Sequence, residues 1–300
     1  MSDTLRLVDA HHHVWDLGHR PQPWLDAPGH APIRRSFGPE DLRTAATRSI
    51  AGRQLDGTVV VQCVPSVAET RELLHMAHRD PMIRAVVGWA DLGSPAIGNV
   101  LDTLLADRGG RYLRSVRHLV QDEPDPRWLQ RPEVERGLRA VGLRGLGYDL
   151  LIRSAQFPQA VRLAERLPEL PLVLDHAGKP PLARRALSRW ERDVRRLAAH
   201  PQVRCKVSGL ITEADHATWT VDDIRPVWDV LLDAFGSDRL MFGSDWPVCV
   251  LAGGWSRWAA TVEELLAECT DAEASAILAG TAADFYRLTP SDVKERTPCS

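Results

Sequence analysis

A run of three histidines ends the first apolar stretch of the chain, within LVDAHHHVWD. Successive side chains of a strand point to opposite faces, so Asp9, His11 and His13 are expected on one side, with Ala10 and His12 on the other. Two imidazoles with this spacing can converge on a single metal ion or a single substrate atom. On this stretch alone, the alternative is a polar strand end with solvated histidines.

Other apolar runs also end in polar side chains that could do chemistry. They are Arg117, His118 and Gln121 after one run, Tyr148 and Asp149 in the next, Asp175 and His176 in another, and Ser244, Asp245 and Trp246 in the last. A single aspartate in such a place is commonly a capping residue of the loop. Several such residues brought to one place are harder to explain by stability alone.

Their chemistry is that of a hydrolase. Two histidines and a carboxylate can hold a divalent ion such as Zn²⁺ and leave room for water. The same carboxylate can accept a proton from the attacking water, while a histidine or arginine opposite polarises a carbonyl group. Although Ser244 precedes Asp245, no GxSxG motif occurs, so a nucleophilic serine is not expected.

The elements that position these residues alternate regularly. Strands are predicted at 5–11, 57–62, 83–90, 113–120, 145–152, 171–177, 203–209 and 239–245, and prominent helices at 39–54, 154–167, 221–236, 256–269 and 271–288. Runs such as VVV in the second strand are apolar on both faces, as buried parallel strands are.

The alternation predicts a single-domain (β/α)8 barrel over 1–300, whose chemistry lies at the C-terminal ends of the strands. The rival is an open doubly wound sheet, which would need a glycine-rich phosphate turn that the sequence lacks. The Pro- and Gly-rich segment 18–39 is expected to form a lid over the site, and 289–300 to be a flexible tail.

Composition excludes several kinds of partner. The 300 residues carry a formal net charge of −3 with mixed signs, so nucleic acid is not expected as a partner. No run of 18 apolar residues predicts a membrane span, and the first residues lack the features of a secretory signal. Five scattered cysteines without a CxxC pair favour free thiols in the cytoplasm. The sequence leaves open whether the protein forms a homodimer.

The stretches DAHHHVWD, VVGWADL, RHLVQ, LVLDHAGKP, CKVSGLITEAD and LMFGSDWPV together resemble the amidohydrolase superfamily, in its branch of L-fuconolactone and L-rhamnonolactone hydrolases. The resemblance runs from about Leu7 to Leu288 and implies the same barrel. It places the superfamily's metal ligands on His11, His13, His176 and Asp245.

The sequence departs from the fuller superfamily pattern in two places. The strand that ends in Arg117 and His118 lacks the bridging lysine or carboxylate, and Tyr148 and Asp149 stand where another metal-binding histidine is usual. The resemblance therefore implies one divalent ion at most, with Zn²⁺ favoured. The branch includes lactonases thought to work without metal, so the resemblance leaves open whether the ion is required.

The leading hypothesis is hydrolysis of an aldonolactone, such as L-fucono- or L-rhamnonolactone, to its sugar acid. Asp245 would be the general base, with His176 and Arg117 polarising the lactone carbonyl. Indole faces suit a sugar ring, and amide or imidazole groups suit its hydroxyls. The expected substrate contacts are Trp24, Trp89, His118, Gln121, Tyr148 and Trp246.

Three alternatives remain. A lactonase for a pyrone dicarboxylate should need several arginines at strand ends, where only Arg117 is evident. A metal-dependent decarboxylase would need a firmly bound ion, which the sparse ligand set disfavours. A non-enzymatic binding protein would have no activity to lose when His11, His13 or Asp245 is changed.

Overall fold

Parallel strands form one sheet that follows the chain order, in a computed structural model that describes residues 6–288. The strands are β1 (Val8–His12), β2 (Gly57–Val61), β3 (Ile83–Gly88), β4 (Leu113–His118), β5 (Gly147–Leu150), β6 (Leu172–Leu174), β7 (Val203–Val207) and β8 (Leu240–Phe242). All eight predicted strands are thereby confirmed. The expected tail at 289–300 lies outside the described residues.

Two backbone hydrogen bonds bring the first and last strands together. The amide of Asp245 donates to the carbonyl of His11 at 2.8 Å, and the amide of His13 donates to that of Trp246 at 2.7 Å. Since the other strands pair in sequence from β1 to β8, the sheet curls into a nearly closed barrel. The predicted (β/α)8 architecture is confirmed.

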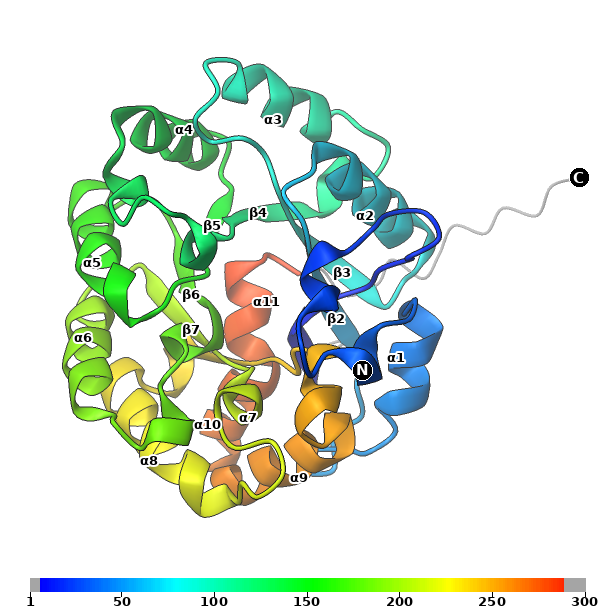
Figure 1. Ribbon diagram of the computed structural model, residues 1–300, viewed down its shortest axis with the longest axis vertical. Coiled ribbons are helices and arrows are strands. Elements are labelled where there is room, and N and C mark those ends of the chain that lie inside the picture. Colours follow the sequence, from blue (N-terminus) through cyan, green and yellow to red (C-terminus); the bar gives the residue numbers. More distant parts are fainter. Residues whose placement is uncertain (1–5, 289–300) are drawn as a thin grey trace, which may run out of the picture.

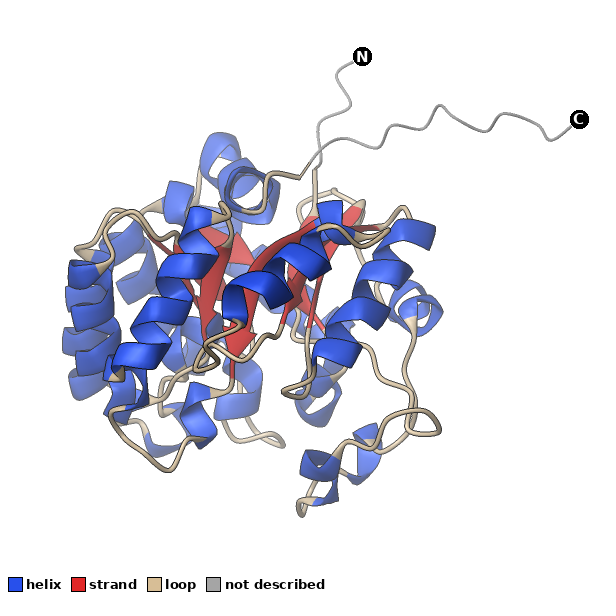
Figure 2. Ribbon diagram, turned by 90° about the horizontal axis from the view of Figure 1, so that it is seen from above, coloured by secondary structure: helices blue, strands red, loops and turns tan. Residues whose placement is uncertain are grey.

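Helices surround the strands, as Figures 1 and 2 show. They are α1 (Pro39–Ala45), α2 (Val67–Arg79), α3 (Ile97–Leu105), α4 (Pro132–Leu143), α5 (Phe157–Arg166), α6 (Ser188–Ala198), α7 (Leu210–Glu213), α8 (Val221–Phe235), α9 (Gly254–Leu265), α10 (Asp271–Ser275) and α11 (Thr281–Phe285). None of them, within 6–288, is both long and apolar enough to cross a membrane.

Local sequence sets the ends of these helices. In α8, Asp223 accepts the backbone N–H of Thr220 in a capping box, and Gly236, at φ 71°, ends the helix as predicted. By contrast, α5 begins at Phe157 rather than at the predicted Ser154, because Pro158 fits only in the first turn. The predicted helix 271–288 is divided into α10, a π-helical turn and α11.

The barrel interior is apolar at one end. Valines from β1 to β3 pack there with Val173, Met241 and residues of the closing segment, including Ala282 and Tyr286. Ala10 belongs to this inner cluster, and the register of β1 on β2 shifts between Asp9 and His12. Simple alternation therefore does not describe β1, because the shift lets His11 follow Ala10 into the interior.

Candidate active site

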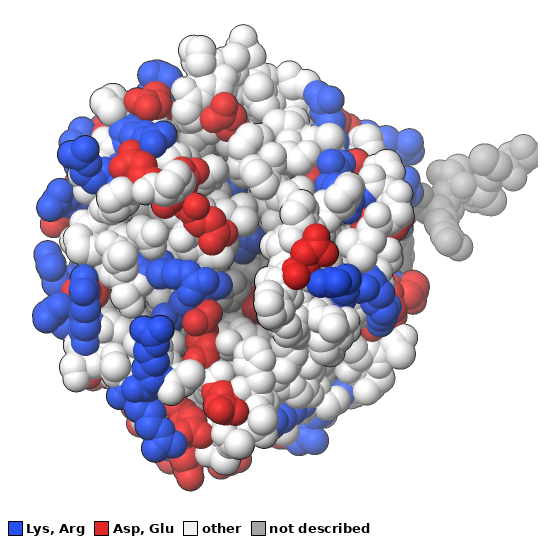
Figure 3. All heavy atoms as spheres, in the orientation of Figure 1, with Lys and Arg blue, Asp and Glu red and all other residues white. Residues whose placement is uncertain are grey.

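A cavity of about 520 Å³, called here the central cavity, opens at the C-terminal ends of the strands. Its polar lining includes His13, His30, Arg117, Gln121, Asp122, Arg153, His176, Lys179, Thr212, Glu213, His216 and Asp245. Figure 3 shows a face that is hollowed near its centre, with basic and acidic side chains mixed around it. The cavity is thus lined by groups from many separate strands and loops.

Three imidazoles approach one carboxylate at the bottom of the central cavity. Asp245 Oδ1 lies 3.5 Å from His13 Nε2, 3.9 Å from His11 Nε2 and 4.0 Å from His176 Nε2. His11 Nε2 and His13 Nε2 are 3.2 Å apart. The four residues predicted as metal ligands therefore lie together, and all four are buried.

Unusual backbone conformations direct two of these side chains. Asp245 and His176 have φ of 57° and 53°, in the left-handed region that non-glycine residues seldom adopt. The chain passes next to them at Gly209, where a Cβ atom would lie 2.6 Å from His176 Nδ1 and 3.1 Å from Asp245 Oδ2. Only glycine fits there, so the approach of β7 to the site depends on Gly209.

The protonation states suit a base among neutral imidazoles. Burial lowers the pKa of His176 to about 4. Burial and the nearby Lys206 hold the pKa of His11 well below 6.5. Burial would raise the pKa of Asp245, but His176 and His13 lower it below 3.8 overall. At neutral pH the carboxylate is therefore ionised and the two histidines are uncharged.

Beneath these groups lies a set of fully enclosed charges, the buried ion cluster of Lys206, Arg117, Asp149 and Asp175. Lys206 Nζ lies 2.6 Å from Asp149 Oδ2, 3.0 Å from Asp175 Oδ1 and 3.1 Å from His11 Nδ1. Arg117 donates to Asp175 Oδ2 at 3.1 Å. Two cations and two anions balance one another, which makes their burial tolerable.

The residues present fit one divalent ion. A Zn²⁺ ion with tetrahedral ligands about 2.0–2.1 Å away would separate those ligand atoms by about 3.3–3.4 Å. Two of the three separations among His11, His13 and Asp245 are within about 0.2 Å of this value, and the third, from His11 Nε2 to Asp245 Oδ1, is 3.9 Å. The Nδ1 of His13 must carry a proton, because it donates to the carbonyl of Val61 at 2.8 Å, so Nε2 keeps its lone pair.

A family model described as Amidohydrolase matches residues 8–288. The chain belongs to this amidohydrolase family. It is 37% identical to an L-fucono-1,5-lactonase of Burkholderia ambifaria, over 94% of this chain and 95% of that protein. The corresponding values for an L-fucono-1,5-lactonase of Burkholderia multivorans are 38%, 96% and 98%.

A solved structure supports the same relationship. An amidohydrolase from Burkholderia multivorans, crystallised with bound Zn, is 37% identical, with a TM-score of 0.85 over 94% of this chain and 99% of that chain. The fold and the family predicted from the sequence are therefore both confirmed.

Two of the six expected substrate contacts, Trp24 and Gln121, line the central cavity of this amidohydrolase. The other four lie outside its lining. Trp89 donates to His118, whose ring stacks on Trp128 at 4.0 Å, while Tyr148 belongs to the apolar core and Trp246 packs on Phe37.

Several groups escaped the sequence reading. Lys206 lies in β7, two residues after Arg204, and its charge within a strand was the available signal. Lys179, in the quoted stretch LVLDHAGKP, and Arg153 also line the central cavity, so Arg117 is not its only cation. Ser208 Oγ lies 2.9 Å from His176 Nδ1, a contact that could not be predicted from the residue type.

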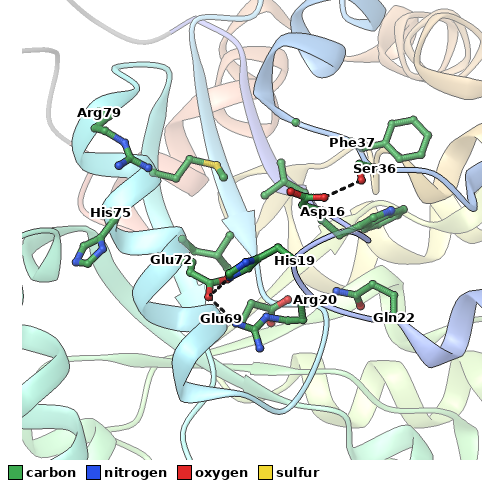
Figure 4. A pocket seen from close by; sticks show the side chains of 15 residues that line it. Asp16, His19, Arg20, Gln22, Ser36, Phe37, Glu69, Glu72, His75 and Arg79 are labelled. Carbon is green, nitrogen blue, oxygen red and sulfur yellow. Dashed lines mark hydrogen bonds and ion pairs between the residues drawn. The ribbon is translucent and has the colours of Figure 1, made fainter.

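A second cavity of about 440 Å³, the lateral cavity, lies between α2 and the segment 18–39. Figure 4 shows the Glu72 carboxylate of α2 between His19 and Arg20, at 3.1 and 2.5 Å from their nitrogen atoms. The two cavities share no lining residue. Residues of 18–39 line both of them, with Trp24 and His30 on the central side.

Proposed function

We propose that this amidohydrolase hydrolyses an aldonolactone, of the L-fucono- or L-rhamnono- class, to the sugar acid. The observation that carries the proposal is the convergence of three imidazoles on the buried Asp245 carboxylate at the bottom of the central cavity. The names of the relatives, L-fucono-1,5-lactonases over nearly the whole chain, support the substrate class.

Asp245 acts as the general base. It accepts a proton from the water that attacks the lactone carbonyl, and its lowered pKa keeps it in the basic form at neutral pH. Arg117 lines the cavity and adds positive charge near the carbonyl oxygen. Trp24 and Gln121 contact the sugar ring through an indole face and an amide.

A single divalent ion, Zn²⁺ by preference, would be held by His11, His13 and Asp245, with His176 nearby. Such an ion supplies Lewis acidity and lowers the pKa of water. The two roles of His176 use opposite tautomers. To donate to a carbonyl, Nε2 must carry the proton, so Nδ1 must accept from the Ser208 hydroxyl. As a ligand, Nε2 must be unprotonated.

The charge of the central cavity favours a neutral lactone over a pyrone dicarboxylate. Three cations, Arg117, Arg153 and Lys179, are matched by three carboxylates, Asp122, Glu213 and Asp245. The three carboxylates would repel a dianionic substrate. The sequence had favoured a neutral lactone because Arg117 was the only arginine evident at a strand end. The structure supports the same preference for a different reason, the balance of charges in the cavity.

We further propose that 18–39 is a lid held by α2. Its Trp24 and His30 line the central cavity, while its His19 and Arg20 are bound to Glu72. We also propose a cytoplasmic location, which is supported by the free thiols of the described cysteines Cys63, Cys205, Cys249 and Cys269.

The deciding experiment is a rate comparison on purified protein, followed by acid release. We expect neutral five- and six-carbon aldonolactones to be opened faster than carboxylated pyrones or phosphate esters. The folded Asp245→Asn variant is the control for chemistry at this site. A faster rate with the pyrone dicarboxylate would reject the proposed substrate class.

A further inference from the structure

The turn that follows β6 is unusually strained. His176, Ala177, Gly178 and Lys179 have consecutive φ values of 53°, 52°, 68° and 55°. Left-handed backbone is unfavourable for a non-glycine residue, and such strain is concentrated at functional sites. The amide of Lys179 donates to the carbonyl of His176 at 2.8 Å, and both side chains line the central cavity.

The side chain of Lys179 lines the central cavity and has an acceptor only at ion-pair distance. Its side chain is 17% exposed, and its partner Glu213 Oε1 lies 3.6 Å away, too far for a hydrogen bond. Burial lowers the pKa of this lysine. Because no acceptor among the described residues lies at hydrogen-bond distance, the N–H groups of Lys179 can donate to an oxygen atom that a ligand brings into the cavity.

The two other groups proposed to act on the lactone carbonyl, Arg117 and His176, already have hydrogen-bond partners. Arg117 gives Nη1 to Asp175 and Nη2 to the carbonyl of Gln62. His176 can donate only in the tautomer that excludes it as a metal ligand. Lys179 carries its N–H groups in either case.

We propose that Lys179 is a further catalytic residue, whose ammonium donates to the carbonyl oxygen of the lactone and stabilises the oxyanion. The inference rests on the proposed function. The water oxygen bonds to the carbonyl carbon, its proton passes to Asp245, and the π electrons move onto the oxygen held by Lys179. As the C=O bond re-forms, the ring C–O bond breaks and the ring oxygen takes the proton back from Asp245. The carboxylic acid produced then ionises.

The test uses Lys179→Gly and Lys179→Ala in the full chain. Loss of one oxyanion donor typically lowers kcat by about 10²–10³-fold, and we expect this loss with a smaller change in KM. The glycine variant should be at least as stable as the alanine variant, because φ is 55° at this position. Added methylammonium should restore part of the activity of Lys179→Ala, whereas tetramethylammonium, which has no N–H, should not.

Arg185→Ala is a matched control. Arg185 also ends a 3-10 turn with positive φ, at 49°, and pairs with Asp223 at 2.8 Å, but it is 84% exposed and lies outside the cavity lining. We expect its kcat to equal that of the wild type.

Two results with an active wild type would overturn the inference. One is a folded Lys179→Gly variant that keeps the wild-type kcat. The other is a loss that neither methylammonium nor Lys179→Arg recovers, which would assign Lys179 a structural role. A wild type that opens no lactone would instead reject the proposed function, and the inference with it.

Discussion

The central and lateral cavities are similar in size but hold their polar groups differently. In the central cavity, His13, His176 and Asp245 come from the ends of different strands, are buried, and are each oriented by a second group. In the lateral cavity, Glu72 is 42% exposed and pairs with side chains of a surface segment. Volume alone therefore does not mark a site, whereas buried groups that fix one another do.

The second difference between the cavities is that paired buried charges lie beneath the central one. The buried ion cluster underlies the central cavity, and Lys206, Asp149 and Asp175 have fully enclosed side chains. Charges in such a place depend on their partners, because water cannot replace a missing one. When an exposed pair such as Glu72 and Arg20 is broken, water solvates both charges. Such a pair therefore contributes only about 0–1 kcal/mol to stability.

The largest effect is expected from Lys206→Met. It keeps the side-chain volume but leaves Asp149 and Asp175 buried without their shared cation, which costs about 3–5 kcal/mol for a broken buried pair. Chemical denaturation would measure the loss. The double variant Lys206→Met/Asp149→Asn should recover part of it. Equal stability of wild type and single variant would show that the cluster does not support the site.

Asp245→Asn should be the most damaging change that spares the fold. Asparagine keeps the shape but cannot accept a proton, so kcat should fall by roughly two orders of magnitude or more, with little change in Tm. The pKa of Asp245 lies below 3.8, so protonation of this base should not reduce wild-type kcat between about pH 5 and pH 8. An unstable variant whose folded fraction turns over normally would make Asp245 a capping residue.

The expected metal content also distinguishes the central cavity from the lateral cavity. Among the described residues, two overlapping groups could hold an ion: His11 with His13 and Asp245, and His11 with Asp175 and His176. Both groups need His11, and Asp175 is already paired with Lys206 and Arg117, so we expect only one group to be occupied. We expect at most about one ion per chain by elemental analysis, and less in His13→Ala. Two tightly held ions per chain would contradict this geometry. Activity that survives thorough chelation would leave the lactonase proposal intact and make the ion dispensable.

The smallest effect is expected at the lateral cavity. Glu72→Gln removes an exposed charge from the lid contact, so the free energy of unfolding should change by less than about 1 kcal/mol. If the lid closes on substrate, KM should still rise by a few-fold. The control is Glu191→Gln on α6, where a similarly exposed carboxylate pairs with Arg195. Identical kinetics in both variants would reject the lid.

Periodicity was sufficient to predict all eight strands and the convergence of His11, His13, His176 and Asp245. Periodicity could not decide which of two adjacent residues at a strand end faces the barrel interior. Arg117 and Asp149 are register partners that face the interior, so His118 and Tyr148 turn toward the helices. A one-residue difference reverses the face, and no local signal reports it.

Lys206 and Lys179 were missed for physical reasons of their own. A lysine two residues after an arginine, as in β7, can equally mark a solvent-facing position. The burial of Lys206 depends on carboxylates from β5 and the end of β6. Lys179 reaches the cavity because four consecutive residues adopt positive φ, a conformation that only Gly178 among them favours by its type. Contacts distant in sequence decided both cases.

The closure of β1 on β8 has a consequence for the newly made protein. On the ribosome, His11 and His13 are synthesised with β1, whereas Asp245 follows only after seven further strands. Nascent chains that stop before β8 therefore lack the base and expose two histidines with no carboxylate beside them. Enzymatic activity should appear only when the last strand docks, so that turnover itself reports that synthesis and folding of the barrel are complete.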